Sequence, residues 1–142
     1  MPDSSDVDQA LVDLLRADAT LAALMPDGVW IDEADAGLEQ FVIVSLVIGL
    51  DAPIFEGRGS EDLVYLVEAR ELSTVAVKNS EAAAARIDAL LELGTLTIAG
   101  YGFQVMRRIE RVRGTEIDAV DSAIRWSRRG GRYQVVVAPT VS

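Results

Sequence analysis

The chain has 142 residues, half of them hydrophobic, and it carries a net charge of −10. This length and composition are typical of one globular domain with its own core. Because the sequence contains neither cysteine nor histidine, it excludes disulfides, thiolate chemistry, His-based triads and the commonest ligands of transition metals. We therefore expect a protein that has no cofactor and is not an enzyme.

No segment approaches the roughly 18 uninterrupted apolar residues of a membrane span. Residues 1–8 are polar and acidic, unlike the basic and apolar start of a secretory signal. These features favour synthesis in a cytoplasm and no contact with a membrane.

Charge is divided unevenly along the chain. Residues 1–106 hold 19 acidic and five basic side chains, a charge of −14, whereas residues 107–142 hold four acidic and eight basic ones, a charge of +4. An acidic chain binds nucleic acid poorly, because that affinity comes largely from neutralised phosphates. The basic third is suited either to local contact with DNA or to the acidic face of another copy.

The first elements are predicted to be helical. Asp3, Ser4 and Ser5 offer N-cap oxygens, and an apolar stripe at Val7, Leu11, Leu14 and Leu15 indicates a helix. A short second helix holding Leu21, Leu24 and Met25 should stop at the Pro-Asp-Gly of residues 26–28. We expect a strand over 29–32 and an acidic loop over 33–40.

The apolar, β-branched run of residues 41–48 predicts a strand that is covered on both faces or buried deep in a sheet. Residues 49–62 break this pattern with a proline and two glycines and are predicted to form a long loop. Its apolar side chains should either fold back onto the core or dock a partner. The docking candidates are Asp51, Pro53, Ile54, Phe55, Glu56 and Arg58.

A strand over 63–72 and a helix over about 75–93 should follow, and the helix cap is Ser73 or Thr74, or else Asn79 or Ser80. Gly94 occupies the position of a C′ glycine. After a turn at 100–102 we expect a strand over 103–112, a loop over 114–122, and a strand over 124–138 that residues 129–131 interrupt.

Pro139 should end the last strand, leaving a short C-terminal tail over 139–142. This order predicts a single α+β domain over residues 1–142. Its sheet should be mixed but mainly antiparallel, with two main helices packed on one face.

Asp32, Glu33 and Asp35 form the closest cluster of carboxylates. Three such oxygens suit Ca²⁺ or Mg²⁺, but the pattern of a calcium loop is absent, so a solvated acidic loop is the favoured interpretation. A small carboxylate-dependent hydrolase is the alternative. The Gly-x-Gly pairs at 57–59 and 100–102 lack the rest of a phosphate-binding motif and indicate turns.

Eight arginines lie in two segments near the C-terminus. If these two segments paired as a hairpin, the arginines would form one basic patch. The alternation of side chains along a strand would divide this patch between the two faces of the sheet. The patch is either a solvated surface with salt bridges to Glu110, Glu116 and Asp118, or a functional interface. The arginines are Arg107, Arg108, Arg111, Arg113, Arg125, Arg128, Arg129 and Arg132. The Arg-Gly-Gly of 129–131 favours a bulge or hairpin turn over a nucleic-acid motif.

Several segments in this order resemble the tail terminator (tail-completion) proteins of long-tailed bacteriophages. At the start these are Gln9-Ala10-Leu11-Val12-Asp13-Leu14-Leu15-Arg16-Ala17-Asp18, then residues 21–24 and 28–30. The strand of residues 41–44 stands where the family often has a proline-tyrosine-valine-valine strand, although this sequence lacks the proline. Residues 63–70, the alanine-rich helix of 80–93 and the closing strand of 133–137 match the later elements.

The resemblance implies a structural virion protein that assembles as a homohexameric ring. In that family the ring caps the finished tail tube and joins it to the head-completion or connector protein. The eight arginines would then serve subunit contacts or line the channel, in passive contact with DNA. The loop over 49–62 would contact the neighbouring ring or the tube. Another neck or head-completion protein of the same particle is the alternative.

Overall fold

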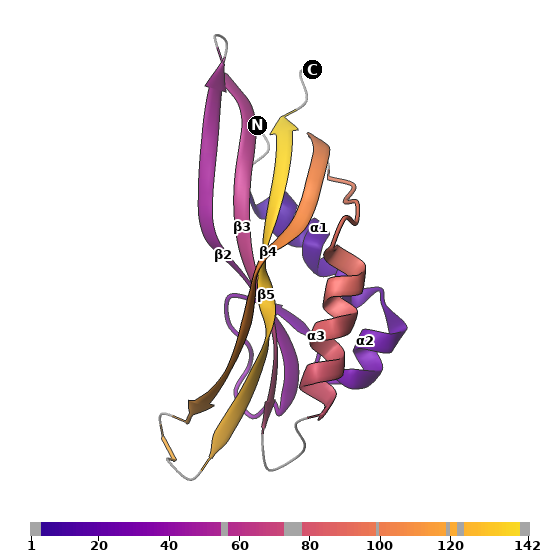
Figure 1. The fold of residues 1–142 in the computed structure, drawn as a ribbon, viewed down its shortest axis with the longest axis vertical. Coiled ribbons are helices and arrows are strands. Elements are labelled where there is room, and N and C mark those ends of the chain that lie inside the picture. Colours follow the sequence, from indigo (N-terminus) through magenta and orange to yellow (C-terminus); the bar gives the residue numbers. More distant parts are fainter. Residues whose placement is uncertain are drawn as a thin grey trace.

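The computed structural model describes residues 4–54, 57–72, 78–98, 100–118, 120–121 and 124–139. Three helices and five strands lie in this part of the chain (Figure 1). The elements are α1 (Ser4–Arg16), α2 (Ala19–Leu24), β1 (Val29–Ile31), β2 (Gln40–Ile54), β3 (Gly57–Leu72), α3 (Lys78–Leu91), β4 (Tyr101–Ile117) and β5 (Arg125–Pro139). None of the described helices is long and apolar enough to cross a membrane.

The strands form one sheet in the order β1-β2-β3-β5-β4. Only β1 and β2 pair in parallel, and the other neighbours are antiparallel. All three helices lie on the same side of the sheet (Figure 1). The predicted α+β class, the mixed but mainly antiparallel sheet and the helices on one face are confirmed.

The core lies between the helices and the face of the sheet that they cover. In α1 the predicted stripe is buried at Val7, Leu11 and Leu15, and α3 buries Ala83 and Ile87 in the same way. This spacing of four residues places one apolar side of each helix against the sheet. The alternating inward residues of the central strands meet them, including Tyr65, Val67, Tyr133 and Val135.

The end of α3 differs from the prediction. Gly94 does not adopt a positive φ, whereas Leu93 does, with φ 57°, so the left-handed residue after the helix is a leucine. Gly94 is needed for another reason: a Cβ atom there would lie 2.4 Å from the carbonyl oxygen of Leu90. The helix starts at Lys78, and residues 73–77, which hold two of the candidate caps, lie outside the described residues.

The predicted loop over 49–62 is wrong where the structure describes it. Antiparallel pairing of β2 with β3 continues from Gly49 opposite Leu63 to Ile54 opposite Gly57. The proline that suggested a loop sits at a register shift between Ala52 and Pro53. Beyond Val44 no described strand pairs with the outer edge of β2, and such an edge tolerates a residue that lacks an N–H.

The C-terminal hairpin also departs from the prediction. β4 extends through 114–117, which were expected to be loop, and β5 passes through Arg129-Gly130-Gly131 without interruption or register shift against β3. A Cβ atom on Gly130 would lie 2.0 Å from the carbonyl oxygen of Val67. The glycines therefore permit close approach of neighbouring strands and do not form a turn. β5 ends at Pro139 as predicted, and 140–142 lie outside the described residues.

Two long hairpins reach opposite ends of the molecule, and only their far ends lie beyond the helical layer (Figure 1). We call residues 45–54 and 57–66 the β2–β3 arm, and residues 111–117 and 125–131 the β4–β5 arm. Leu46, Val47 and Ile48 of the first arm are 38%, 38% and 48% exposed. The expectation of a strand covered on both faces is therefore wrong for the end of the 41–48 run.

Candidate functional site

β4 pairs with β5 and brings the two arginine-bearing segments together, which meets the condition stated for a single basic patch. Arg113 lies opposite Arg129, and Arg111 lies opposite Gly131. Tyr133 and Ser127 of β5 contact α3 through their hydroxyls, so the odd-numbered side chains of this strand face the helices. The alternation of side chains divides the patch between the two faces of the sheet.

The helix-covered face receives Arg108, Arg111, Arg113 and Arg129. The helix-free face receives Arg107, Arg128 and Arg132, because Arg107 pairs with Gln134 and Arg128 and Arg132 are even-numbered positions of β5. Arg125 stands opposite Ile117 at the end of the β4–β5 arm.

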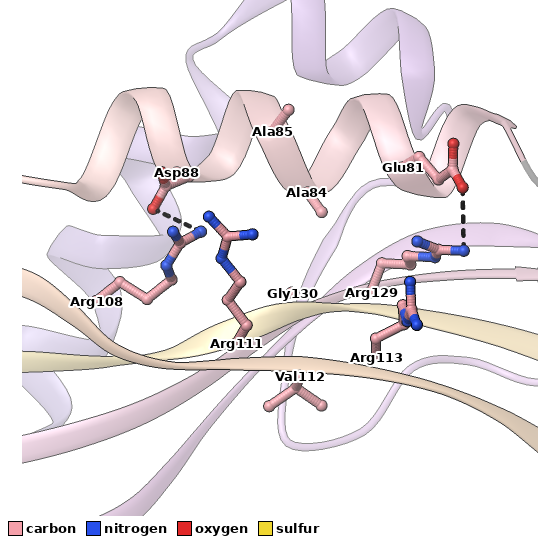
Figure 2. A pocket seen from close by; sticks show the side chains of 10 residues that line it. All are labelled: Glu81, Ala84, Ala85, Asp88, Arg108, Arg111, Val112, Arg113, Arg129 and Gly130. Atoms are coloured by element: carbon pink, nitrogen blue, oxygen red, sulfur yellow. Dashed lines mark ion pairs between the residues drawn. The ribbon is translucent and has the colours of Figure 1, made fainter.

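On the helix-covered face the arginines line a cleft of about 730 Å³ between α3 and the β4–β5 hairpin (Figure 2). We call it the basic cleft. The short side chains of Ala84 and Ala85 leave room on its helical side. The full lining is Glu81, Ala84, Ala85, Asp88, Arg108, Arg111, Val112, Arg113, Arg129 and Gly130.

Two of the four arginines are neutralised across the cleft. Arg108 lies 3.3 Å from the carboxylate of Asp88, and Arg129 lies 3.0 Å from that of Glu81. Arg111 and Arg113 are exposed and have no acidic partner among the residues that the structure describes. The cleft thus holds four guanidinium groups, which stay charged, against two carboxylates, and this excess suits it to an anionic ligand.

Hydrogen bonds to the sheet hold α3, the helical wall of the basic cleft, in place. The hydroxyl of Tyr133 donates to Asp88 at 2.9 Å, and burial raises the pKa of this hydroxyl, so it remains protonated. At the other end of α3 the Ser80 N–H donates to the buried Glu71 carboxylate at 3.2 Å, where the helix dipole favours negative charge. Two anchors along one helix hold the arginines and their partners in place.

The arginines of the helix-free face are engaged with partners on neighbouring strands. Arg128 and Arg70 both pair with Glu68, at 3.2 and 3.0 Å, and Glu68 is fully buried between them. Arg132 lies 3.4 Å from Glu110. Arg107 donates to Gln134 at 3.0 Å.

The interpretation of the patch as a surface with salt bridges therefore describes the arginines of the helix-free face. Glu110 and Glu116 take part in these salt bridges as predicted. Asp118 does not. It accepts the N–H groups of Val120 and Asp121 and the indole N–H of Trp126. Sequence reasoning missed Glu68, although a carboxylate inside an apolar strand is a signal of a buried ion pair.

We define the acidic loop as residues 32–39, which include the carboxylate cluster singled out in the sequence. Asp32, Glu33 and Asp35 are exposed, and within the described ranges no group of three or more acidic side chains is arranged to hold a metal ion. The structure gives no support to the carboxylate-dependent hydrolase. Asp32 adopts φ 62°, a left-handed conformation that Asp tolerates better than most residues.

Four of the six predicted docking residues lie on the β2–β3 arm, namely Asp51, Pro53, Ile54 and Arg58. Phe55 and Glu56 lie outside the described residues. Their docking role stays a prediction. The exposed Leu46, Val47 and Ile48 of the same arm were missed as a surface, because a continuous apolar run favours burial.

Comparison with known proteins finds no matching family profile and no matching curated protein. Solved structures do match. A chain from the virion of a native gene transfer agent particle is 21% identical, with a TM-score of 0.67, over 94% of this chain and 96% of that one. Another solved chain, without a functional description, is 12% identical, with a TM-score of 0.56, over 95% and 96%. The fold is therefore shared over almost the whole length of each chain.

Proposed function

We propose that this chain is a structural virion protein of a phage-like particle. The observation that carries the proposal is the fold likeness to a chain of the gene transfer agent virion, which covers 94% of this chain and 96% of that one. The match spans almost the whole of both chains, so it involves the complete fold and not a small motif shared by many proteins. The resemblance of the sequence itself to tail terminators names the more specific role.

In that role the chain forms a ring, a hexamer in the family it resembles, that caps the tail tube and joins it to the head connector. The shape of the subunit supports a joint, because its two arms project at opposite ends of the molecule (Figure 1). The β2–β3 arm presents the exposed Leu46, Val47 and Ile48, and exposed apolar groups of this kind are typical of protein contacts. We assign this arm to the neighbouring ring or tube, together with Asp51, Pro53, Ile54 and Arg58.

The helix-free face suits the channel. Arg107, Arg128 and Arg132 are already engaged with Gln134, Glu68 and Glu110, so few unpaired cations face the lumen. The net charge of −10 further weakens attraction to phosphates. DNA would pass such a wall with passive contact only.

Native mass measurement and electron microscopy of the purified chain, alone and mixed with isolated tail tubes, test the proposal. The expected result is a closed ring that is seated on one end of the tube. A chain that stays monomeric at all concentrations and does not bind tubes would contradict it. Rings found only at the head connector in images of whole particles would assign the chain to another neck protein.

The arm can be tested separately with a matched pair of variants. Replacing Leu46, Val47 and Ile48 with serine should abolish binding to tubes and leave ring formation intact. The control replaces Leu93, Ile109 and Ile117, which are 73%, 49% and 57% exposed elsewhere, with serine. Equal loss of tube binding in both variants would show that the β2–β3 arm does not make the contact with the tube.

A further inference from the structure

We propose that the basic cleft receives the acidic loop (residues 32–39) of a second copy of this chain. The inference rests on the proposed function and identifies the contact between neighbouring subunits of the ring. It follows from three observations: an unbalanced cleft, a rigid loop of opposite charge, and the placement of the two on the sheet.

Two of the four arginines in the basic cleft have no carboxylate partner among the described residues. Arg111 and Arg113 come from β4; Arg111 lies beside the Arg108–Asp88 pair and Arg113 lies beside the Arg129–Glu81 pair (Figure 2). Each guanidinium presents a planar fork of donors that matches the two oxygens of a carboxylate. Two further carboxylates would bring the cleft to charge balance.

The loop supplies free carboxylates. Asp32, Glu33, Asp35 and Glu39 are all exposed, and no described side chain donates to them. No lysine or arginine occurs anywhere from residue 17 to residue 57. The loop is therefore a concentrated negative charge without a basic neighbour in sequence.

The loop is also held in shape, which lowers the entropy that docking would cost. At one end the N–H of Asp32 donates to the Val44 carbonyl at 2.9 Å. At the other end the Asp27 carboxylate accepts the N–H groups of Glu39 and Gln40 at 2.8 and 3.0 Å. These two bonds hold the pKa of Asp27 below its usual range, so it remains an ionised acceptor.

The order of the sheet places the two surfaces on opposite edges. The loop joins β1 to β2 at one edge, and the cleft is built on β4 at the other, because the strands follow the order β1-β2-β3-β5-β4. One copy therefore uses its cleft while its loop remains available for the next. Such a head-to-tail contact builds rings when the rotation closes.

A phosphate backbone fits the cleft less well. Glu81 and Asp88 line its helical wall and would face the phosphates of a nucleic acid on that side, and the chain as a whole is strongly acidic. Binding of nucleic acid is thus the competing outcome that the experiment must separate.

A charge exchange tests the contact. Variant A carries Arg111→Glu and Arg113→Glu, and variant B carries Glu33→Arg and Asp35→Arg. Each alone should fail to form rings, in solution or on tube ends, because its cleft and loop then carry the same sign. An equimolar mixture should restore rings of alternating A and B, since every junction regains opposite charges. The control Asp6→Arg/Asp13→Arg changes the same charge on the exposed side of α1 and should leave assembly intact.

The absence of cysteine permits a second measurement. A chain with Glu33→Cys and Arg111→Cys should form a ladder of disulfide-linked oligomers on oxidation. A chain with Glu33→Cys and Arg107→Cys, whose second thiol lies on the helix-free face of β4, should not.

Each remaining outcome has its own meaning. If variants A and B each form rings alone, and the Glu33→Cys/Arg111→Cys chain gives no disulfide ladder, the inference is overturned and the proposed function stands. Intact rings together with a salt-dependent loss of DNA affinity in variant A would make the cleft a nucleic-acid site and overturn the inference as well. A wild-type chain that neither forms rings nor binds tubes would overturn the proposed function itself.

Discussion

Tyr65 and Tyr133 are direct partners across β3 and β5, yet their hydroxyls bind different helices. Tyr65 donates to Asp8 of α1, and Tyr133 donates to Asp88 of α3. Both rings are fully buried, and burial raises the pKa of each hydroxyl, which keeps it a donor. One cross-strand pair thus fixes two helices to the sheet centre, and through Asp88 it also supports the basic cleft.

Replacing Tyr133 with phenylalanine should lower the free energy of unfolding by about 1 kcal/mol, because one buried hydrogen bond is lost. Asp88 would keep its ion pair with Arg108, which limits the loss. Urea unfolding at neutral pH measures the change, and Tyr65→Phe provides the matched comparison on the other helix. Stability equal to the wild type in both variants would show that these bonds contribute nothing net.

Gly130→Ala should destabilise the fold by roughly 3 kcal/mol, in the range of severe overpacking. The new Cβ would lie 2.0 Å from the Val67 carbonyl oxygen, so β3 and β5 would have to separate. Gly114→Ala is the control, because nothing lies within 4 Å of its Cβ position. Thermal unfolding of the two variants side by side checks this, and similar melting temperatures would refute the close approach.

Glu68→Gln should lower the free energy of unfolding by about 2–3 kcal/mol. This is somewhat less than the loss expected for breaking a fully buried ion pair, because the Arg70 and Arg128 side chains are 28% and 31% exposed. The loss leaves two guanidinium groups on the helix-free face, where Glu116 is the remaining acidic partner among the described residues. The apolar triple variant Glu68→Leu/Arg70→Met/Arg128→Met should be closer to the wild type. Denaturant unfolding ranks the three proteins, and a triple variant less stable than Glu68→Gln would contradict this account.

The Asp18–Arg86 pair should make stability sensitive to acid. The Arg86 guanidinium donates two hydrogen bonds to Asp18, at 2.9 and 2.6 Å, and lowers the pKa of this carboxyl to about 2. A lowered folded-state pKa contributes stability that is present above the unfolded value of 3.8 and is lost as the pH falls toward 2.

Asp18→Asn should therefore be less stable than the wild type at pH 6, and the difference should shrink at pH 2.5. Urea unfolding at the two pH values measures this. Asp6→Asn, which alters an exposed carboxylate of α1, should show no such convergence. A constant gap between Asp18→Asn and the wild type at both pH values would be inconsistent with the pair.

The helices and the inner strands could be predicted from the sequence because their signals are local. The stripe of α1 repeats every three to four residues, and the turn before β1 is specified by the Pro-Asp-Gly of 26–28, where Gly28 has φ 94°. The pairing of the two arginine segments was also accessible from the sequence, because they are neighbouring predicted strands joined by a short polar loop.

The arms were not predictable from local pattern. Pro53 and the nearby glycines predict a loop, and only the exposed position of this edge strand makes a proline compatible with pairing. Gly130 and Gly131 predict an interruption, whereas contact with β3 and Glu110 makes them necessary for a continuous strand. The basic cleft depends on α3 lying over β4, a tertiary arrangement that no window of the sequence reveals.

The two arms differ in chemistry as well as position. One carries Leu46, Val47 and Ile48 outward, while the other bears Arg113, Glu116 and Arg125 among its exposed and half-exposed side chains. A ring of such subunits in register would present an apolar row toward one side, and charged side chains together with the exposed Ile117 toward the other. Such a ring would fit between two different neighbours in one orientation only. The fold of each subunit would then determine the polarity of the finished particle.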